Sequence, residues 1–336
     1  MFSPKMRYEL SDAEAGKILN DFLPDKIFDA HAHLFDTDLL PALTFGLPDR
    51  LIGGWDRYKE EMSVVLCNPR QLRINAVSYP DGKMANRDSG LIEKSDAFLI
   101  GELNRCADNV GEIVVHPQET EEDLEKRLTH PGIRGFKCYH NLSGNPDSWN
   151  ATIGEYLPES AWAVANRRKM VITLHMVRDH ALADEKNLSY IRTMAKKYPD
   201  TVLILAHCAR AFASWTGVES VGKLSDLDNV WFDFSAVCES PAMVQILKKA
   251  GISRCMWGSD YPVCRSRGKA ISLGDSFYWI YQNDLDHFVS KTRVSSYLIA
   301  TENLMAVRQA FLLAEPGDDA IEDFFFNNAA RLFSRK

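Results

Sequence analysis

Short apolar runs alternate with amphipathic segments along most of the chain, starting near residue 26. Helical spacing of apolar residues recurs in the amphipathic segments, as at 120–128, 156–168, 188–198 and 241–250. Strands that alternate with such helices indicate βαβ units and a parallel sheet. The second strand is assigned to 74–79, and the apolar segment 62–67 is the alternative for it. The eight runs that fit buried strands are 27–33, 74–79, 112–116, 133–139, 171–176, 202–208, 230–237 and 255–261.

Eight such repeats predict an α/β fold that closes into one (β/α)₈ TIM barrel, although an open doubly wound sheet would give a similar pattern. The sequence contains no internal repeat, low-complexity tract or flexible linker, which favours a single domain. We therefore expect a leader at 1–26, with a short helix at 12–22, followed by the barrel at 27–336. Two long loops, 141–155 after the fourth strand and 264–317 after the eighth, are expected to carry function.

Composition and charge narrow the classes of function. With 336 residues, 46% of them hydrophobic, the chain is long enough to bury a large core. A formal net charge of −7 gives no attraction to a phosphate backbone, so we expect no nucleic-acid partner. The first residues lack the apolar region of a signal peptide, and no apolar run is long enough to span a membrane. Seven cysteines without a C-x-x-C pair indicate free thiols in a reducing cytoplasm rather than a Cys₄ zinc site.

Two histidines, separated by one residue, lie where the first strand is expected to end. Because alternate side chains of a strand share a face, His31 and His33 are expected to point the same way. Two imidazoles on one face of a rigid strand can bind a single metal ion. A bare H-x-H motif is nevertheless a weak signal, since two unrelated polar histidines at a strand end would look the same.

Three further candidates lie at the ends of later strands. His175 ends the fifth apolar run, His207 comes near the end of the sixth, and Asp260 comes near the end of the eighth. In a barrel, the residues after the strands meet at one mouth, where active sites lie. Histidines with a carboxylate suit a zinc-type ion that keeps a coordination position open for water. The sequence therefore predicts a metal centre at the barrel mouth.

This order of residues resembles the amidohydrolase superfamily. The segments FDAHAH, LAHCAR, WGSDYPV and NNAARLF are similar to those of its amidohydrolase-2 branch, which holds lactonases, other hydrolases and nonoxidative decarboxylases. The resemblance implies that His31, His33, His175 and Asp260 hold one divalent metal, with zinc expected and manganese as the alternative. It also implies that His207 orients the nucleophile or the substrate without binding that metal.

Lys137, on the predicted fourth strand, leaves two interpretations open. In two-metal members of the superfamily, a lysine at this strand end is carboxylated and bridges two ions, and His175 and His207 bind the second. The alternative is a free ammonium that contacts an anionic substrate. Resemblance to the amidohydrolase-2 branch favours the free ammonium. A second metal is expected only if Lys137 is carboxylated.

Basic side chains after the catalytic strands indicate a small anionic substrate, such as a carboxylate. We expect Lys137, Tyr139, Arg178, Arg210 and Arg265 to bind it. Assembly into a homo-oligomer stays open. Other residues that could line the same rim or pocket are Trp149, His180, Trp215, Tyr261, Arg267 and Lys269.

The expected reaction is hydrolysis of a lactone, ester or amide by metal-activated water. Asp260 would take the water's proton and pass it to the leaving group, while His207 would stabilise the oxyanion or hold the water. The sequence has no G-x-S-x-G elbow, P-loop or dinucleotide-binding fingerprint. A non-catalytic barrel that binds a metal or ligand is a further alternative. The nearer rival is a carboxy-lyase of the same branch, in which a substrate carboxylate could be held by Arg50, Arg57, Arg70 or Arg73.

Overall fold

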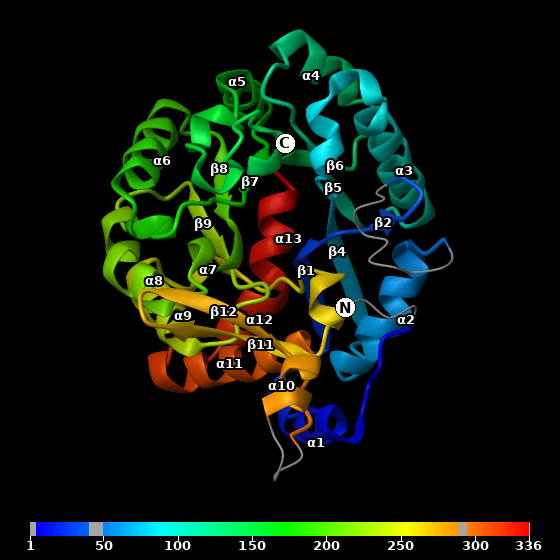
Figure 1. Cartoon of the computed structure of the whole chain (residues 1–336), viewed down its shortest axis with the longest axis vertical. Coiled ribbons are helices and arrows are strands. Elements are labelled where there is room, and N and C mark those ends of the chain that lie inside the picture. The colour runs from blue at the N-terminus through cyan, green and yellow to red at the C-terminus, as the bar shows by residue number, and fades with distance from the viewer. Residues whose placement is uncertain (1–4, 40–49, 289–293, 336) are drawn as a thin grey trace.

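The computed structural model describes residues 5–39, 50–288 and 294–335, and its core is a sheet of parallel strands (Figure 1). Each strand of this sheet pairs with the next strand of the sheet along the chain, in the order β1-β4-β5-β6-β7-β8-β9-β10. The strands are β1 (Lys26–Ala32), β4 (Gln71–Val77), β5 (Val110–Val114), β6 (Ile133–Cys138), β7 (Val171–Leu174), β8 (Val202–Leu205), β9 (Val230–Asp233) and β10 (Cys255–Met256).

The sheet closes on itself where β10 and the residues after it meet β1. The Ala30 N–H donates to the Trp257 carbonyl oxygen at 2.9 Å, and the His33 N–H donates to the Tyr261 carbonyl oxygen at 2.7 Å. A parallel bridge joins Ala32 to Tyr261. The predicted (β/α)₈ barrel is therefore confirmed, and the open sheet is excluded.

The second strand lies where the favoured interpretation put it. β4 includes most of the predicted run 74–79, and the competing segment begins inside the helix α2 (Trp55–Val65). Several predicted runs extend beyond the observed strands, as at 202–208, because apolar residues continue into the turns at the barrel mouth. The predicted runs thus located the strands but not their ends.

Helices cover the outside of the barrel (Figure 1). Local signals set their ends: the Thr120 hydroxyl and the Asp123 carboxylate cap the start of α4 reciprocally, and Asp184 accepts from backbone N–H groups at the start of α6. The helices after α2 that cover the barrel are α3 (Leu91–Arg105), α4 (Glu121–Arg127), α5 (Glu159–Arg168), α6 (Glu185–Lys197), α8 (Ser214–Ser220), α9 (Ser240–Lys249) and α11 (Ile299–Ala314).

The last helix, α13 (Asn328–Phe333), closes the end of the barrel where the strands begin. Phe333 packs against Phe28 of β1 with ring centroids 5.6 Å apart. Leu332 and Phe333 join buried residues near the strand starts, including Val171 and Val202, in one apolar cluster. Because apolar side chains fill this end of the barrel, an active site is expected at the opposite end, where the strands finish.

The leader and the long segment after β10 are folded onto the barrel. Helix α1 (Leu10–Leu19) carries Asp12, whose buried carboxylate accepts from the Leu298 N–H at 2.9 Å and pairs with Arg267 at 2.6 Å. The segment 264–317 contains the hairpin β11 (Gly268–Leu273)/β12 (Ser276–Tyr281) and the helices α10 (Gln282–Phe288) and α11. The remaining elements are β2 (Phe35–Asp36), β3 (Ile52–Gly53), α7 (Ala206–Arg210), α12 (Ala320–Glu322), several 3₁₀ turns and a π-helical turn at 323–327.

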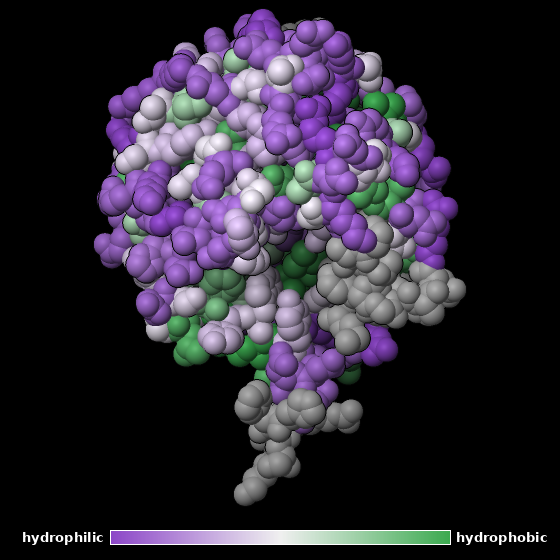
Figure 2. All heavy atoms as spheres, turned by 45° about the horizontal axis from the view of Figure 1, so that its top comes forward, coloured by the Kyte–Doolittle hydropathy of each residue, from purple (hydrophilic) through white to green (hydrophobic). Residues whose placement is uncertain are grey.

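Hydrophilic residues cover most of the face shown in Figure 2, and hydrophobic residues gather in a hollow near its middle. All seven cysteines are free thiols, as predicted. Within the described ranges, no helix combines the length and the apolar character that crossing a membrane requires.

Candidate metal centre

Five side chains meet where the strands end, and we call them the ligand cluster: His31, His33, His175, His207 and Asp260. The Nε2 atoms of His31 and His33 lie 3.1 Å apart. Oδ1 of Asp260 lies 3.5 Å from the Nε2 of His33 and 3.8 Å from that of His31. Nδ1 of His175 lies 3.2 Å from Nε2 of His207. The structure therefore brings all five residues together.

The backbone is strained where two of these residues leave their strands. His207 begins a run of four left-handed residues that ends at Arg210, and Asp260 has a φ of 56°. Such conformations are unfavourable for residues other than glycine and recur at functional sites. The left-handed turn lets the His207 N–H donate to Asp233 at 3.1 Å. It also brings Arg210 to the mouth.

Three of the imidazoles are oriented by acceptors on their other ring nitrogen. Nδ1 lies 2.9 Å from the Asp233 carboxylate in His31, 3.0 Å from the Val77 carbonyl oxygen in His33 and 3.2 Å from the Ser235 carbonyl oxygen in His207. Because carboxylates and carbonyls only accept, each Nδ1 carries the proton and each Nε2 presents a lone pair. Histidines that bind metals are held in this way.

The arrangement fits a divalent cation. The lone pairs of His31 and His33 face each other at 3.1 Å beside the Asp260 carboxylate, which is repulsive unless a positive charge lies near them. The Nε2 of His175 is buried without a hydrogen-bond partner. Atoms of His31, His207 and Asp260 lie within 4.8 Å of one another, close enough to share one ion. This group includes His207, which was expected to orient the nucleophile, and leaves out His175, which was expected to bind the metal. The separate roles of the two histidines therefore stay a prediction.

Lys137 lies against the ligand cluster from β6. Its Nζ is 3.2 Å from the Nε2 of His31, and its side chain is buried. Burial lowers the pKa of Lys137, while the charges of Asp233, Glu112 and Asp260 act in the opposite direction. The Lys137 side-chain nitrogen thus lies beside the Nε2 atom of His31.

Two buried carboxylates complete the surroundings and were absent from the sequence prediction. Asp233 ends β9, and burial would raise its pKa, but its interactions with the His31 and His207 imidazoles and its hydrogen bonds to His31 and Ser235 lower the pKa overall. Glu112 on β5 accepts from Asn75 at 2.6 Å and Thr173 at 2.8 Å, and burial raises its pKa to about 7. Both carboxylates lie inside or at the start of predicted apolar runs. The sequence did offer one signal for these two residues, since each is a single acidic residue in a run that is otherwise mostly apolar.

Hydrogen bonds to the buried Asp29 carboxylate fix the backbone next to Asp260. Asp29 accepts from the backbone N–H groups of His31 and Ser259, both at 2.9 Å, and from the Tyr58 hydroxyl at 2.6 Å. Burial raises the pKa of Asp260 well above its usual value, and the charges of Asp233 and Asp29 add to this, whereas Lys137 acts against it. These contacts place the carboxylate beside the imidazoles.

Arg210 and aromatic rings form part of the mouth. The Arg210 guanidinium lies 5.5 Å from the Trp149 ring and 5.4 Å from the Phe277 ring of β12. Tyr139 lies 4.6 Å from His175, ring to ring. Among the described residues, no carboxylate forms an ion pair with Arg210, and burial lowers its pKa. A guanidinium beside two aromatic rings therefore lies close enough to the ligand cluster for its charge to act on His175.

The other basic residues proposed for substrate binding have protein partners. Arg178 pairs with Asp184 at 2.8 Å and donates to Asn150, which ties down the loop after β6. Arg265 is buried and lies 2.8 Å from Glu61. The other rim residues also have protein partners: Arg267 contacts Asp12, Lys269 contacts Glu302, Tyr261 contacts Glu61, Trp215 contacts the Asp275 carbonyl, and His180 contacts Trp215. The same holds for the arginines considered for a carboxy-lyase: Arg50 contacts Asp36, Arg57 contacts Glu61, Arg70 contacts Asp25, and Arg73 contacts the Asp108 carbonyl.

Comparison with known structures shows the same fold in metal-bound enzymes. A Burkholderia multivorans amidohydrolase with bound zinc is 14% identical and has a TM-score of 0.59, with 93% of this chain and 100% of that chain covered. A Novosphingobium aromaticivorans 5-carboxyvanillate decarboxylase, complexed with manganese and a nitrobenzoic acid, is 12% identical, has a TM-score of 0.58 and is covered over the whole of both chains.

A third structure is a Pseudomonas putida protein provisionally named 2-pyrone-4,6-dicarboxylic acid hydrolase. It is 16% identical with a TM-score of 0.56, and 93% of this chain and 98% of that chain are covered. No curated protein matches the chain by similarity. A sequence model of the family described as Amidohydrolase (Amidohydro_2) matches residues 28–335. The chain therefore belongs to the amidohydrolase-2 family of metal-dependent enzymes, which includes hydrolases and decarboxylases.

Proposed function

We propose that this protein is a metal-dependent hydrolase that cleaves a lactone, ester or amide bond in a small substrate bearing a carboxylate. The observation that carries the proposal is the position of Asp260. Its carboxylate lies at the mouth, 3.5 Å from the Nε2 lone pair of His33, where it can both contact a cation and exchange a proton.

The metal would be held by His31, His33, His175 and Asp260. When bound, a divalent ion at such a site lowers the pKa of water and polarises a carbonyl group. Zinc fits the nitrogen-rich donor set best, and manganese is the alternative. Because the chain belongs to the amidohydrolase-2 family, we favour a free Lys137 and one ion. A carboxylated Lys137 would instead supply a further ligand, and a second ion would then be expected.

Asp260 is assigned the proton transfer. As water attacks the carbonyl carbon, an oxygen–hydrogen bond of the water breaks and the proton passes to the Asp260 carboxylate. The tetrahedral intermediate then collapses, the bond to the leaving oxygen or nitrogen breaks, and Asp260 returns the proton to that atom. The contacts of Asp29 with the backbone of His31 and Ser259 keep the carboxylate in place.

His207 is assigned to hold the attacking water. Its Nδ1 donates to the Ser235 carbonyl oxygen, and burial lowers its pKa to about 3, so the ring is neutral. Nε2, which lies 3.2 Å from Nδ1 of His175, can accept a hydrogen bond from a neighbouring N–H or from water but has no proton to donate to an oxyanion. Of the two roles predicted for His207, the geometry therefore supports water binding.

Arg210 is assigned to the substrate carboxylate. The guanidinium has no carboxylate partner among the described residues, and an incoming anion would supply one. The Trp149 and Phe277 rings, each within 5.5 Å of the guanidinium, suit a flat or apolar portion of the substrate. Arg178 and Arg265, which already pair with Asp184 and Glu61, have less capacity for a second anion.

Turnover in ¹⁸O-labelled water tests the proposal. The compounds to be tried are lactones, amides and unsaturated or aromatic carboxylic acids. A hydrolase places a solvent oxygen in the product, whereas a carboxy-lyase releases carbon dioxide and takes up only a solvent proton. Oxygen incorporation supports hydrolysis. Release of carbon dioxide without oxygen incorporation, from any acid that is turned over well, would replace it with the carboxy-lyase assignment.

A further inference from the structure

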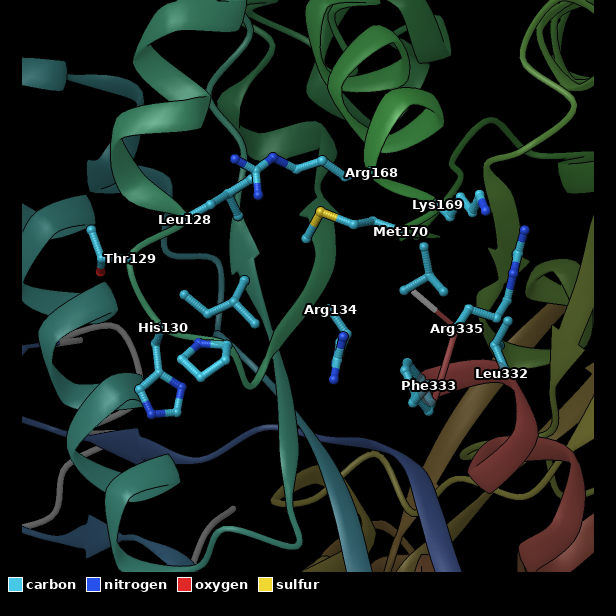
Figure 3. A pocket seen from close by; sticks show the side chains of 13 residues that line it. Leu128, Thr129, His130, Arg134, Arg168, Lys169, Met170, Leu332, Phe333 and Arg335 are labelled. Carbon is cyan, nitrogen blue, oxygen red and sulfur yellow. The ribbon is translucent and has the colours of Figure 1, made fainter.

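A second polar hollow lies at the opposite end of the barrel from the ligand cluster. It has a volume of about 520 Å³, within the usual range of small-molecule sites. Its walls come from the loop before β6 and the start of that strand, from the turn between α5 and β7, and from the end of α13 with the residues after it (Figure 3). Three segments that are distant in sequence therefore enclose one space.

The lining of this hollow is strongly basic. Figure 3 shows Arg134 in the middle, with Arg168, Lys169 and Arg335 around it. Among the described residues that line the hollow, none is acidic. This concentration of positive charge is unexpected in a chain with a formal net charge of −7.

Most of these charges lack a carboxylate partner. Arg168 pairs with Glu125, but Arg335 donates only to a neutral backbone carbonyl, that of Asp200, at 3.0 Å. Neither Arg134 nor Lys169 forms an ion pair within the described part of the chain, and the Nε of Arg134 is buried without a hydrogen-bond partner. Like charges held together without a counter-charge repel one another, and a bound anion would relieve that repulsion.

An adjoining hollow of about 440 Å³ continues the same surface. It shares His130, Arg134 and Phe333 with the first and adds Arg73. The Arg73 guanidinium donates to the Asp108 carbonyl oxygen and lies 4.5 Å from the Phe28 ring. No acidic side chain is found among the described residues of this lining either. The basic region thus extends far enough to contact an anion with more than one charged group.

We propose that these adjoining hollows bind a small molecule carrying two or more phosphate groups. Guanidinium groups match phosphate oxygens with paired hydrogen bonds, and here they approach from several sides. A concave space of this volume suits a compact polyanion rather than an extended nucleic acid. Because α13 fills the barrel between this region and the mouth, the site is separate from the proposed catalytic centre.

Calorimetric titration of the metal-loaded protein with inorganic tripolyphosphate tests the proposal. The double variant Arg134→Gln/Lys169→Gln removes two of the cations that lack a carboxylate partner among the described residues. Its matched control is Lys248→Gln/Lys249→Gln on α9, which removes the same charge from an exposed site. We expect the wild type and the control to bind equally, and the Arg134/Lys169 variant to bind at least tenfold more weakly. Metal content is measured in each titration, because polyphosphates also chelate divalent ions.

Arg335→Gln provides a second test and should also weaken binding, because Arg335 lines the hollow and donates only to the Asp200 carbonyl oxygen. Equal affinities in the pocket and control variants would overturn the proposal, as would no binding to the wild type at millimolar tripolyphosphate. Citrate is titrated for comparison. If it binds as tightly as tripolyphosphate, the assignment to phosphate is wrong.

Discussion

Asp233 contacts two members of the ligand cluster at once. Its Oδ2 lies 2.9 Å from Nδ1 of His31, its Oδ1 accepts the His207 backbone N–H at 3.1 Å, and the Ser235 hydroxyl also donates to it. Its negative charge makes the His31 imidazole a stronger donor to a metal and fixes the ring orientation. Asp233 is therefore a positioning residue for the metal centre.

Replacing this carboxylate with an amide tests that role. We expect Asp233→Asn to lower metal affinity by roughly 10- to 100-fold, because the charge on the His31 partner is lost while the shape is kept. Competition with a chelator measures the affinity. Asp228→Asn, an exposed position just before β9, is the control and should bind metal like the wild type. Unchanged affinity in Asp233→Asn would contradict the assigned role.

Glu112 should make stability depend on pH. Burial raises its pKa to about 7 from an ordinary value of 4.5, so the folded protein favours the protonated form. This contribution to stability is complete below pH 4.5 and is lost as the pH rises through 7. A pKa shift of this size corresponds to roughly 3 kcal/mol in the free energy of unfolding.

Glu112→Gln removes the titration and keeps the hydrogen-bonding shape. We expect the melting temperature of the variant, relative to the wild type, to rise by several degrees between pH 5.5 and pH 8.5. Glu122→Gln on the exposed face of α4 should follow the wild type at both pH values. A constant difference between Glu112→Gln and the wild type would rule out this source of pH dependence.

Arg210 gives a test of substrate charge. We expect Arg210→Met to raise KM for a carboxylate substrate at least tenfold, since a charge-assisted hydrogen bond is lost. The KM for the methyl ester of the same compound should change little, because the ester presents no anion. Steady-state kinetics on the acid and ester pair measure both. An equal effect on the two compounds would mean that Arg210 does not recognise the charge.

At the scale of elements, Asn303 joins α11 to the ends of two barrel strands. Its Nδ2 donates to the carbonyl oxygens of Phe234 at 2.6 Å and Val237 at 2.7 Å, and its Oδ1 accepts from the Trp257 indole at 3.0 Å. All three contacts are buried. A single amide thus fixes the helix against the segments that carry Ser235 and Asp260.

Truncating this amide should be costly for stability. We expect Asn303→Ala to lower the free energy of unfolding by roughly 3 kcal/mol, because three buried polar groups lose their partner. Denaturant unfolding measures the change. Asn327→Ala, at an exposed position whose side chain donates only to Asp323, should stay within about 0.5 kcal/mol of the wild type. Similar losses in both variants would contradict the account.

The elements also show why part of this architecture could be predicted. The strands were visible as apolar runs, and His31, His175 and Asp260 stood out because each is a polar residue at the end of such a run. Contacts between distant residues leave no such local pattern. Asp12 reaches Leu298, 286 residues away, and Phe277 of the hairpin reaches Arg210. Asp233 and Glu112 were missed because their apolar surroundings hid their contact with the mouth.

At the scale of the whole molecule, the two ends of the barrel differ in construction. The end where the strands begin is filled by α13 and bordered by basic side chains, most of which have no carboxylate partner in the described part of the chain. The end where the strands finish holds the ligand cluster, with buried carboxylates beneath it. The proposed chemistry depends on one divalent ion bound at this second end.

Metal analysis of the purified protein, with crystallographic location of the ion by anomalous scattering, tests that dependence most directly. The account predicts about one ion per chain, in contact with His31, His33, His175 and Asp260. It also predicts an empty site in a His31→Ala/His33→Ala variant that keeps its fold, as shown by circular dichroism. Full metal occupancy in that double variant would contradict the account, and a second ion beside Lys137 would contradict the single-metal assignment.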